Sequence, residues 1–146
     1  MPNLRRLGGT YKGLIGEIMF VSSNTQYILP RFHPKNKYLG NMELDNEKRR
    51  FLDENWYSID AISYDGKYII EIKTRNSYSG YLPYKPKASQ KSIQILVSAA
   101  ATGFAVSVAT VWFKENWEFE IEVKPFKSDE LHADSKKRYD GAFRDT

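Results

Sequence analysis

Residues 56–74 read WYSIDAISYDGKYIIEIKT and predict a β-hairpin. The dipeptide Asp65-Gly66 separates two runs rich in apolar and β-branched residues. Such a dipeptide between such runs is the strongest short-range indication of a two-residue turn. Tyr64 then faces Lys67, and each step away from the turn moves both strands by one residue. We therefore expect a tight hairpin with a defined register.

Charged side chains collect on one face of this hairpin. In the predicted register Asp60 lies directly opposite Glu71, and Lys73 follows on the same face with Ser58 opposite it. Directly opposed residues have Cβ atoms about 4.5–5.5 Å apart, and like charges placed there destabilise the sheet. A divalent cation would neutralise such a pair. The alternative is a solvated strand end whose charges keep the protein soluble.

Apolar residues cover both faces of the hairpin nearer the turn. The face of the charges carries Ile62 and Ile69, and the reverse face carries Ile59, Ala61, Ile70 and Ile72. Strands that are apolar on both faces are typical of the interior of a covered sheet. The hairpin is therefore predicted to be central, with its charges at the end far from the turn.

The chain before the hairpin predicts two helices and a strand. A helix over residues 10–21 places Glu17 away from its apolar side, a strand follows over 25–32, and a surface helix covers 43–52. The apolar side of the first helix is predicted to consist of Leu14, Ile18 and Val21.

The chain after the hairpin predicts a helix over residues 86–102 that ends at Gly103, then a central strand over 104–113 and an edge strand over 117–124. The buried stripe of this helix is predicted to be Ile93, Leu96, Val97 and Ala100. Together these elements predict an α/β fold with a mixed central β-sheet flanked by helices.

Composition limits the class of protein. A chain of 146 residues with 41% hydrophobic residues suits one folded domain, predicted over residues 1–126 with a charged, flexible tail at 127–146. The absence of cysteine excludes disulfides and thiolate metal sites, so a metal must be held by oxygen or imidazole. Without a phosphate-binding glycine loop we expect no nucleotide cofactor. The start MPNLRRLGG lacks a secretory signal, which favours a cytoplasmic, intracellular protein.

The 22 uncharged residues between Lys91 and Lys114 raise the question of a membrane span. Gly103 divides this segment into a helical pattern and a strand pattern, so it is predicted to be core, with no membrane partner.

Charge is distributed unevenly around a net value of +4. No acidic residue occurs from position 72 to 114, which favours a polyanionic partner over a merely solvated basic loop. The tyrosines at 78, 81 and 84 could stack on unpaired bases or simply hold their loop on the body. The predicted nucleic-acid contacts are Arg31, Lys35, Arg75, Tyr81, Lys85, Lys87 and Lys91.

These motifs resemble the PD-(D/E)XK nuclease superfamily. Residues 58–60, Ser-Ile-Asp, correspond to its first element and residues 71–73, Glu-Ile-Lys, to its second, with Ile59 in place of the usual proline. Glu17 matches the glutamate that often lies on the preceding helix. Gln90, or Gln94 one turn later, matches a polar residue on the following helix. The pattern looks most like archaeal Holliday-junction resolvases and related small endonucleases, despite a long polar insert after residue 32.

The resemblance implies a restriction-endonuclease-like core and a Mg²⁺-dependent or Mn²⁺-dependent endodeoxyribonuclease. Asp60, Glu71, the Ile72 carbonyl and Glu17 would hold the metal. Lys73 would orient or deprotonate the attacking water. The partners implied are DNA, possibly branched, and a second copy of the chain in a homodimer. The alternatives are a nuclease for single-stranded, nicked or specific duplex DNA, and a catalytically silent nucleic-acid-binding module.

Overall fold

The computed structural model describes residues 9–76, 87–114, 118–127 and 132–133, and within them five strands form a mixed sheet in the order β1-β2-β3-β5-β6. β3 and β5 are parallel, and the other neighbouring pairs are antiparallel. The strands are β1 Tyr27–Ile28, β2 Ala61–Ser63, β3 Tyr68–Asn76, β5 Ala105–Phe113 and β6 Phe119–Pro125.

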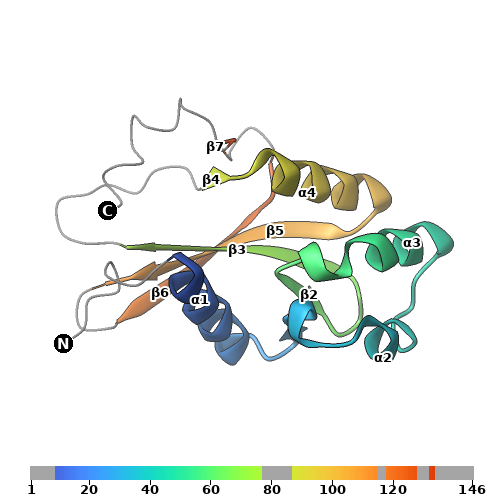
Figure 1. Cartoon of the computed structure of the whole chain (residues 1–146), viewed down its shortest axis with the longest axis horizontal. Helices are drawn as coiled ribbons and strands as arrows, with labels where there is room; N and C mark the ends of the chain where they lie inside the picture. Colours follow the sequence, from blue (N-terminus) through green and yellow to red (C-terminus); the bar gives the residue numbers. More distant parts are fainter. Residues whose placement is uncertain (1–8, 77–86, 115–117, 128–131, 134–146) are drawn as a thin grey trace.

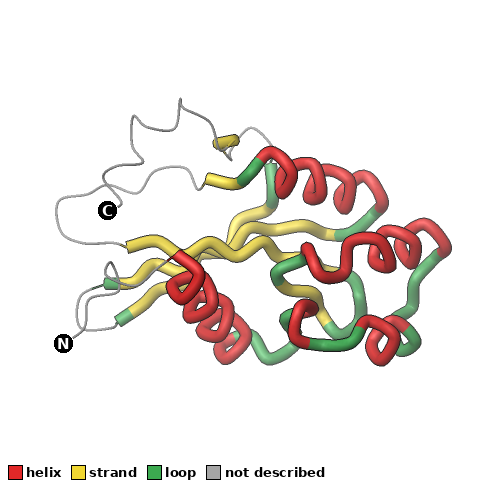
Figure 2. The backbone as a smooth tube through the Cα atoms, viewed as in Figure 1, coloured by secondary structure: helices red, strands yellow, loops and turns green. Residues whose placement is uncertain are grey.

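Helices cover both faces of this sheet. Figure 1 shows α1 on one side and α4 on the other, with α3 beyond the short strand β2. The same view in Figure 2 shows β3 and β5 running side by side through the centre. The remaining elements are α1 Gly9–Ser23, η2 Pro30–Phe32, α2 Lys35–Leu39, α3 Asn46–Asn55, η3 Trp56–Ser58, α4 Gln90–Thr102, and the small pair β4 Lys87–Ala88 with β7 His132–Ala133.

The predicted hairpin register is confirmed, because Ala61 pairs with Ile70 and Ile62 with Ile69. The connection between the strands is longer than predicted. β2 ends at Ser63 and β3 begins at Tyr68, which leaves a four-residue loop instead of a two-residue turn. The Ser63 hydroxyl accepts hydrogen bonds from the backbone N–H groups of residues 67 and 68, so it replaces the last rung of the ladder.

The first strand of the hairpin is shorter than predicted. Residues 56–58 form η3 instead of strand, so the expectation that Ser58 faces Lys73 across a ladder is wrong. Trp56 explains the difference, since its buried indole donates a hydrogen bond to the His33 carbonyl, 3.0 Å away, and holds this turn against η2. Ile59 consequently packs with Ile62 and not on the reverse face.

Two helices bury a face other than the predicted one. In α1 the buried residues include Glu17 and Phe20, whereas Ile18 is 47% exposed. In α4 the buried residues are Leu96 and Ala99, so the assignment of Val97 and Ala100 to the core is wrong. In each helix the residues buried against the sheet differ from the predicted stripe. Hydrophobic spacing alone does not fix the rotation of a helix about its axis when apolar residues occur on more than one side of it.

Some helices and strands begin or end at residues other than the predicted ones, because capping residues or a proline define their ends. Asp45 caps α3 by accepting a hydrogen bond from the Lys48 N–H, so this helix covers 46–55 and not 43–52. Ser89 caps α4, which therefore begins at Gln90 and not near residue 86. The predicted strand over 25–32 is reduced to Tyr27–Ile28, because η2 begins at Pro30.

Other boundaries agree with the prediction. α4 ends before Gly103, whose φ of +112° lies in the left-handed region that favours glycine. β5 is central and β6 lies at the edge of the sheet. No helix within the described ranges is long and apolar enough to cross a membrane.

The core has one apolar cluster on each side of the sheet. On the α1 side, Phe20 packs with Ile70 and Ile72, and on the α4 side Leu96 packs with Ile69. Gly16 brings α1 unusually close to β3, since a Cβ at this position would lie 1.9 Å from the Thr74 Oγ1. This approach places Glu17, the next residue, against the central strand.

Candidate active site

The candidate site lies where β2 and β3 separate. Pairing in the hairpin extends no further than Ala61 and Ile70, and Asp60 is the first residue beyond it. Asp60 Oδ2 instead accepts a hydrogen bond from the Ile72 backbone N–H at 2.8 Å. Because the N–H and C=O of one residue in a strand point to the same side, the Ile72 carbonyl also faces this edge.

Asp60 and Glu71 meet at this edge. Burial raises the pKa of Asp60 from 3.8 to about 8, helped by the negative charge of Glu71 and a hydrogen bond between the two carboxyl groups, and opposed by the Ile72 N–H. Glu71 is buried, and Asp60 is half-buried. Burial and the charge of Glu71 therefore favour the protonated form of the Asp60 carboxyl group at neutral pH.

Lys73 lies beside this pair. Its Nζ is 2.9 Å from Glu71 Oε2, and both side chains are largely shielded from water, with exposed fractions of 16% and 8%. Residues 71 and 73 share a face because side chains alternate along β3. The Lys73 ammonium group, which comes from the same strand as Glu71, therefore compensates part of the negative charge at the site.

Glu17 approaches the same edge from α1. Burial raises its pKa, the Arg31 guanidinium opposes this rise, and the charge of Glu71 adds to it. Arg31 Nη2 lies 2.7 Å from Glu17 Oε1. That oxygen is nevertheless buried without a hydrogen bond, because the contact lacks hydrogen-bond alignment. The Arg31 guanidinium therefore holds the Glu17 carboxylate by charge, within the electrostatic reach of Glu71.

The donor set fits a hard divalent cation. Asp60, Glu71, Glu17 and the Ile72 carbonyl offer oxygen ligands, which Mg²⁺ and Mn²⁺ prefer. The support for this fit is the chemistry of the all-oxygen donor set, in which Glu17 Oε1 is paired with Arg31. In the described ranges no three His, Asp or Glu side chains already form a group that could hold a metal ion. Glu17 pairs with Arg31, Asp60 with the Ile72 N–H, and Glu71 with Lys73. A bound cation would have to replace or share these contacts.

The other predicted site residues have the following surroundings where the structure describes them. Gln90 and Lys91 are exposed in the first turn of α4, so no burial holds Gln90 against the carboxyl groups. Lys35 pairs with Asp53 at 2.9 Å. Arg75 is half-buried and donates a hydrogen bond to the Thr74 carbonyl. The structure describes only the backbone of Lys87, and Tyr81 and Lys85 lie outside the described residues, as does most of the predicted tail.

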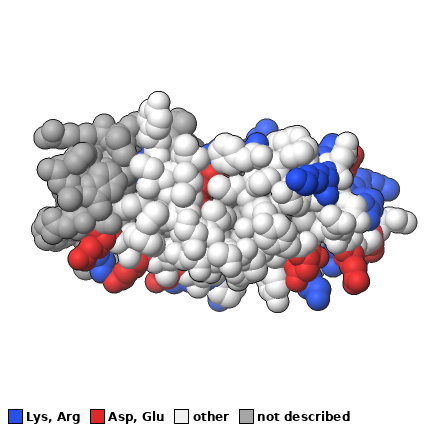
Figure 3. All heavy atoms as spheres, turned by 90° about the horizontal axis from the view of Figure 1, so that it is seen from below, with Lys and Arg blue, Asp and Glu red and all other residues white. Residues whose placement is uncertain are grey.

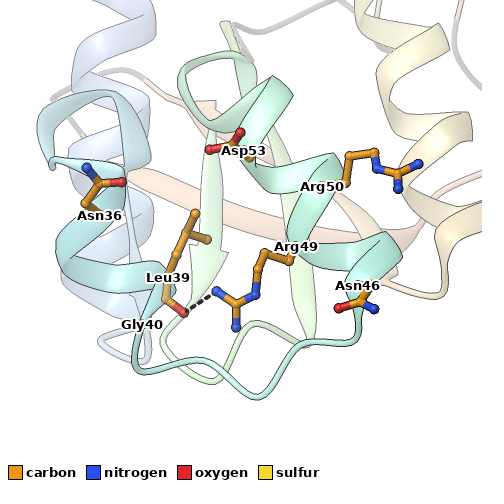
Figure 4. A pocket seen from close by; sticks show the side chains of 7 residues that line it. All are labelled: Asn36, Leu39, Gly40, Asn46, Arg49, Arg50 and Asp53. Carbon is orange, nitrogen blue, oxygen red and sulfur yellow. Dashed lines mark hydrogen bonds between the residues drawn. The ribbon is translucent and has the colours of Figure 1, made fainter.

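A shallow basin separate from the acidic site lies between α2 and α3. Figure 4 shows the Arg49 guanidinium directed at the Leu39 carbonyl, 3.5 Å from it. Its lining is Asn36, Leu39, Gly40, Asn46, Arg49, Arg50 and Asp53, and none of these is a predicted catalytic residue. On the face in Figure 3, acidic and basic side chains are intermixed around the end formed by α2 and α3, and the middle of that face is mostly uncharged.

Two contacts at the site were not anticipated from the sequence. One is the pairing of Arg31 with Glu17, and the other is the hydrogen bond from the Ile72 N–H to Asp60. Pro30 offered a signal for the first contact. A proline at the start of a short helical turn ends the preceding strand, and the next side chain can then turn back toward α1.

Comparison with protein-family models, with curated protein sequences and with solved structures finds no match to this chain. The interpretation of the site therefore depends on its own geometry and chemistry.

Proposed function

We propose that this chain is a Mg²⁺-dependent or Mn²⁺-dependent DNA endonuclease with a restriction-endonuclease-like core. The observation that carries the proposal is the contact of Asp60 and Glu71 where β2 leaves β3, with the Lys73 ammonium 2.9 Å from Glu71. A buried acidic pair beside an amine, with Glu17 approaching from a third element, is the donor set that metal-assisted phosphodiester hydrolysis requires.

Each residue has a distinct part in this proposal. A bound Mg²⁺ or Mn²⁺ would neutralise negative charge on the scissile phosphate and lower the pKa of a water bound to it. Asp60, Glu71 and the Ile72 carbonyl would hold the cation, and Glu17 would reach it directly or through water. From its position beside Glu71, Lys73 would orient the attacking water as an ammonium group, or deprotonate it as a neutral amine.

The proposed substrate is DNA inside the cell, with a branched junction as the first choice. Two copies of the chain would present one site to each of two strands, so the proposed active form is a homodimer. The basic residues of the acid-free segment 72–114 support a polyanionic substrate. Arg31 lies at the acidic cluster and is exposed enough to contact a phosphate.

The test is cleavage of labelled DNA. Four-way-junction, nicked, single-stranded and duplex substrates are incubated with the protein in Mg²⁺ or in EDTA. Asp60→Ala, Glu71→Ala and Lys73→Ala should each lower the cleavage rate at least about 100-fold while sparing binding, since they remove groups at the reacting centre. Glu122→Ala, an exposed acid on β6, is the matched control and should cut normally. Cleavage by Asp60→Ala at the normal rate would refute the proposed site.

A nucleic-acid-binding module of the same fold is the competing function. The absence of a ready-made metal group among the described residues favours it, because Glu17, Asp60 and Glu71 each already have a partner. DNA binding by the wild-type protein with no cleavage of any substrate in Mg²⁺ or Mn²⁺ would establish this alternative.

A further inference from the structure

Two short helical turns lie side by side next to the acidic cluster. They are η2, which ends at Phe32, and η3, which contains Tyr57. The indole N–H of Trp56 donates to the His33 carbonyl at 3.0 Å and ties the second turn to the first. Although Trp56 is almost fully buried, Phe32 is 55% exposed and Tyr57 is 60% exposed. The pair of turns thus presents two aromatic rings to solvent.

Both turns connect directly to the acidic residues. Arg31 precedes Phe32 in η2, and its guanidinium carbon lies 5.0 Å from the centroid of the Phe32 ring. The same guanidinium lies 2.7 Å from Glu17. On the other turn, Asp60 follows Tyr57 by three residues. The Arg31 guanidinium therefore lies between the Phe32 ring and the Glu17 carboxylate, and the turn that carries Tyr57 leads into Asp60.

Exposed aromatic rings beside a cation match the chemistry of an unpaired base. Each base has a π-face that stacks on an aromatic side chain, and an arginine nearby can contact the phosphate of the same nucleotide. Bases inside a continuous duplex already stack on their neighbours, so they reach such a platform only after an unfavourable unstacking step. An unpaired base avoids most of that cost.

We propose that Phe32 and Tyr57 form a stacking site for an unpaired base of DNA, with Arg31 contacting the adjoining phosphate. This inference rests on the proposed function and specifies its substrate class. DNA with an unpaired nucleotide at the reacting phosphodiester, as at a branch point, a gap or a single strand, binds more tightly than continuous duplex of the same length. The two rings act in binding and take no part in the hydrolysis itself.

The test is a binding measurement in EDTA, where no cleavage occurs. Fluorescence anisotropy gives the Kd of each variant for a labelled single strand, for a duplex with a one-nucleotide gap and for the intact duplex. Phe32→Ala and Tyr57→Ala should each weaken binding to the single strand and the gapped duplex about fivefold or more. Their binding to intact duplex should change less than twofold. Phe32→Tyr and Tyr57→Phe keep an aromatic ring and should bind as the wild type does.

A matched control and a direct readout accompany this measurement. Tyr64→Ala removes a tyrosine of similar exposure, 53%, from the hairpin loop and should leave all three Kd values unchanged. A 2-aminopurine opposite the gap reports stacking through the quenching of its fluorescence, which the two alanine variants should reduce. The stacking site is refuted if the wild type does not prefer unpaired DNA, if it binds no DNA, or if Phe32→Ala and Tyr57→Ala match Tyr64→Ala. Failure of cleavage alone refutes the nuclease and leaves this binding result standing.

Discussion

Replacing Asp60 by asparagine should stabilise the folded protein at alkaline pH. The folded-state pKa of about 8 lies above the value of 3.8 for an unperturbed aspartate. Between these two values the folded protein keeps a proton that the unfolded chain has released. The free energy of unfolding therefore falls as pH rises, by up to about 1.4 kcal/mol per pH unit from this group. Asparagine has no proton to lose and avoids this penalty.

The size of the effect follows from the same shift. The full difference between pH 4 and pH 8 sets an upper limit of roughly 5 kcal/mol. The access of water to this half-buried group reduces the limit, so we expect a gain of roughly 1–3 kcal/mol at pH 8.5. The asparagine oxygen can still accept from the Ile72 N–H, and its amide can donate to Glu71, so little is lost in exchange.

The assay is urea unfolding of both proteins in metal-free buffer at intervals from pH 4 to pH 9. The difference between Asp60→Asn and wild type should grow with pH across this window and level off above pH 8. Asp65→Asn is the control in the same hairpin. The Ser63 hydroxyl and the Lys67 N–H lower the pKa of Asp65, so its contribution is present above pH 4 and disappears in acid. A pH-independent difference for Asp60→Asn, or a loss of stability at pH 8.5, would refute the picture of a buried carboxyl pair.

Three further changes test the packing and the cation site. Gly16→Ala should cost about 1–3 kcal/mol in urea unfolding, because the new Cβ meets Thr74 Oγ1, and Thr74→Ala should recover part of that loss. Leu96→Ala should lower the free energy of unfolding by about 2–4 kcal/mol, and Val97→Ala by less than about 0.5 kcal/mol. Equal losses for the two variants would contradict the burial of Leu96 and the exposure of Val97. Millimolar Mg²⁺ or Mn²⁺ should raise the Tm in a calorimetric scan at pH 8, and Glu71→Gln should abolish the rise; an equal rise in both proteins would place the ion elsewhere.

Local patterns predicted the centre of the fold well. The hairpin register, which sets Asp60 against Glu71, followed from a dipeptide and an alternating pattern, because in a strand a one-residue slip would reverse every side chain. The stop of α4 at Gly103 followed from the conformational freedom of glycine at that position. Such features depend on a few neighbouring residues and can be deduced from them.

Tertiary contacts decided what the sequence could not. The strand expected over residues 56–64 gives way to η3 because Trp56 finds an acceptor 23 residues earlier in the chain, at His33. The same kind of contact, between Arg31 and Glu17, gives the acidic cluster a basic neighbour that no spacing rule would suggest. The rotation of α1 depends on the gap that Gly16 leaves for Thr74, a fit between distant residues.

The hydrogen bond of the Trp56 indole connects the segment proposed to stack on a base with the segment that leads to the proposed metal ligand Asp60. One interior ring fixes the spacing between the segment that leads into Asp60 and the segment that carries Arg31 and Phe32. A substitution that shifts this ring would therefore move the proposed metal ligand Asp60 and the proposed base-binding residue Phe32 together. A variant with altered base binding but unchanged metal binding should therefore retain Trp56.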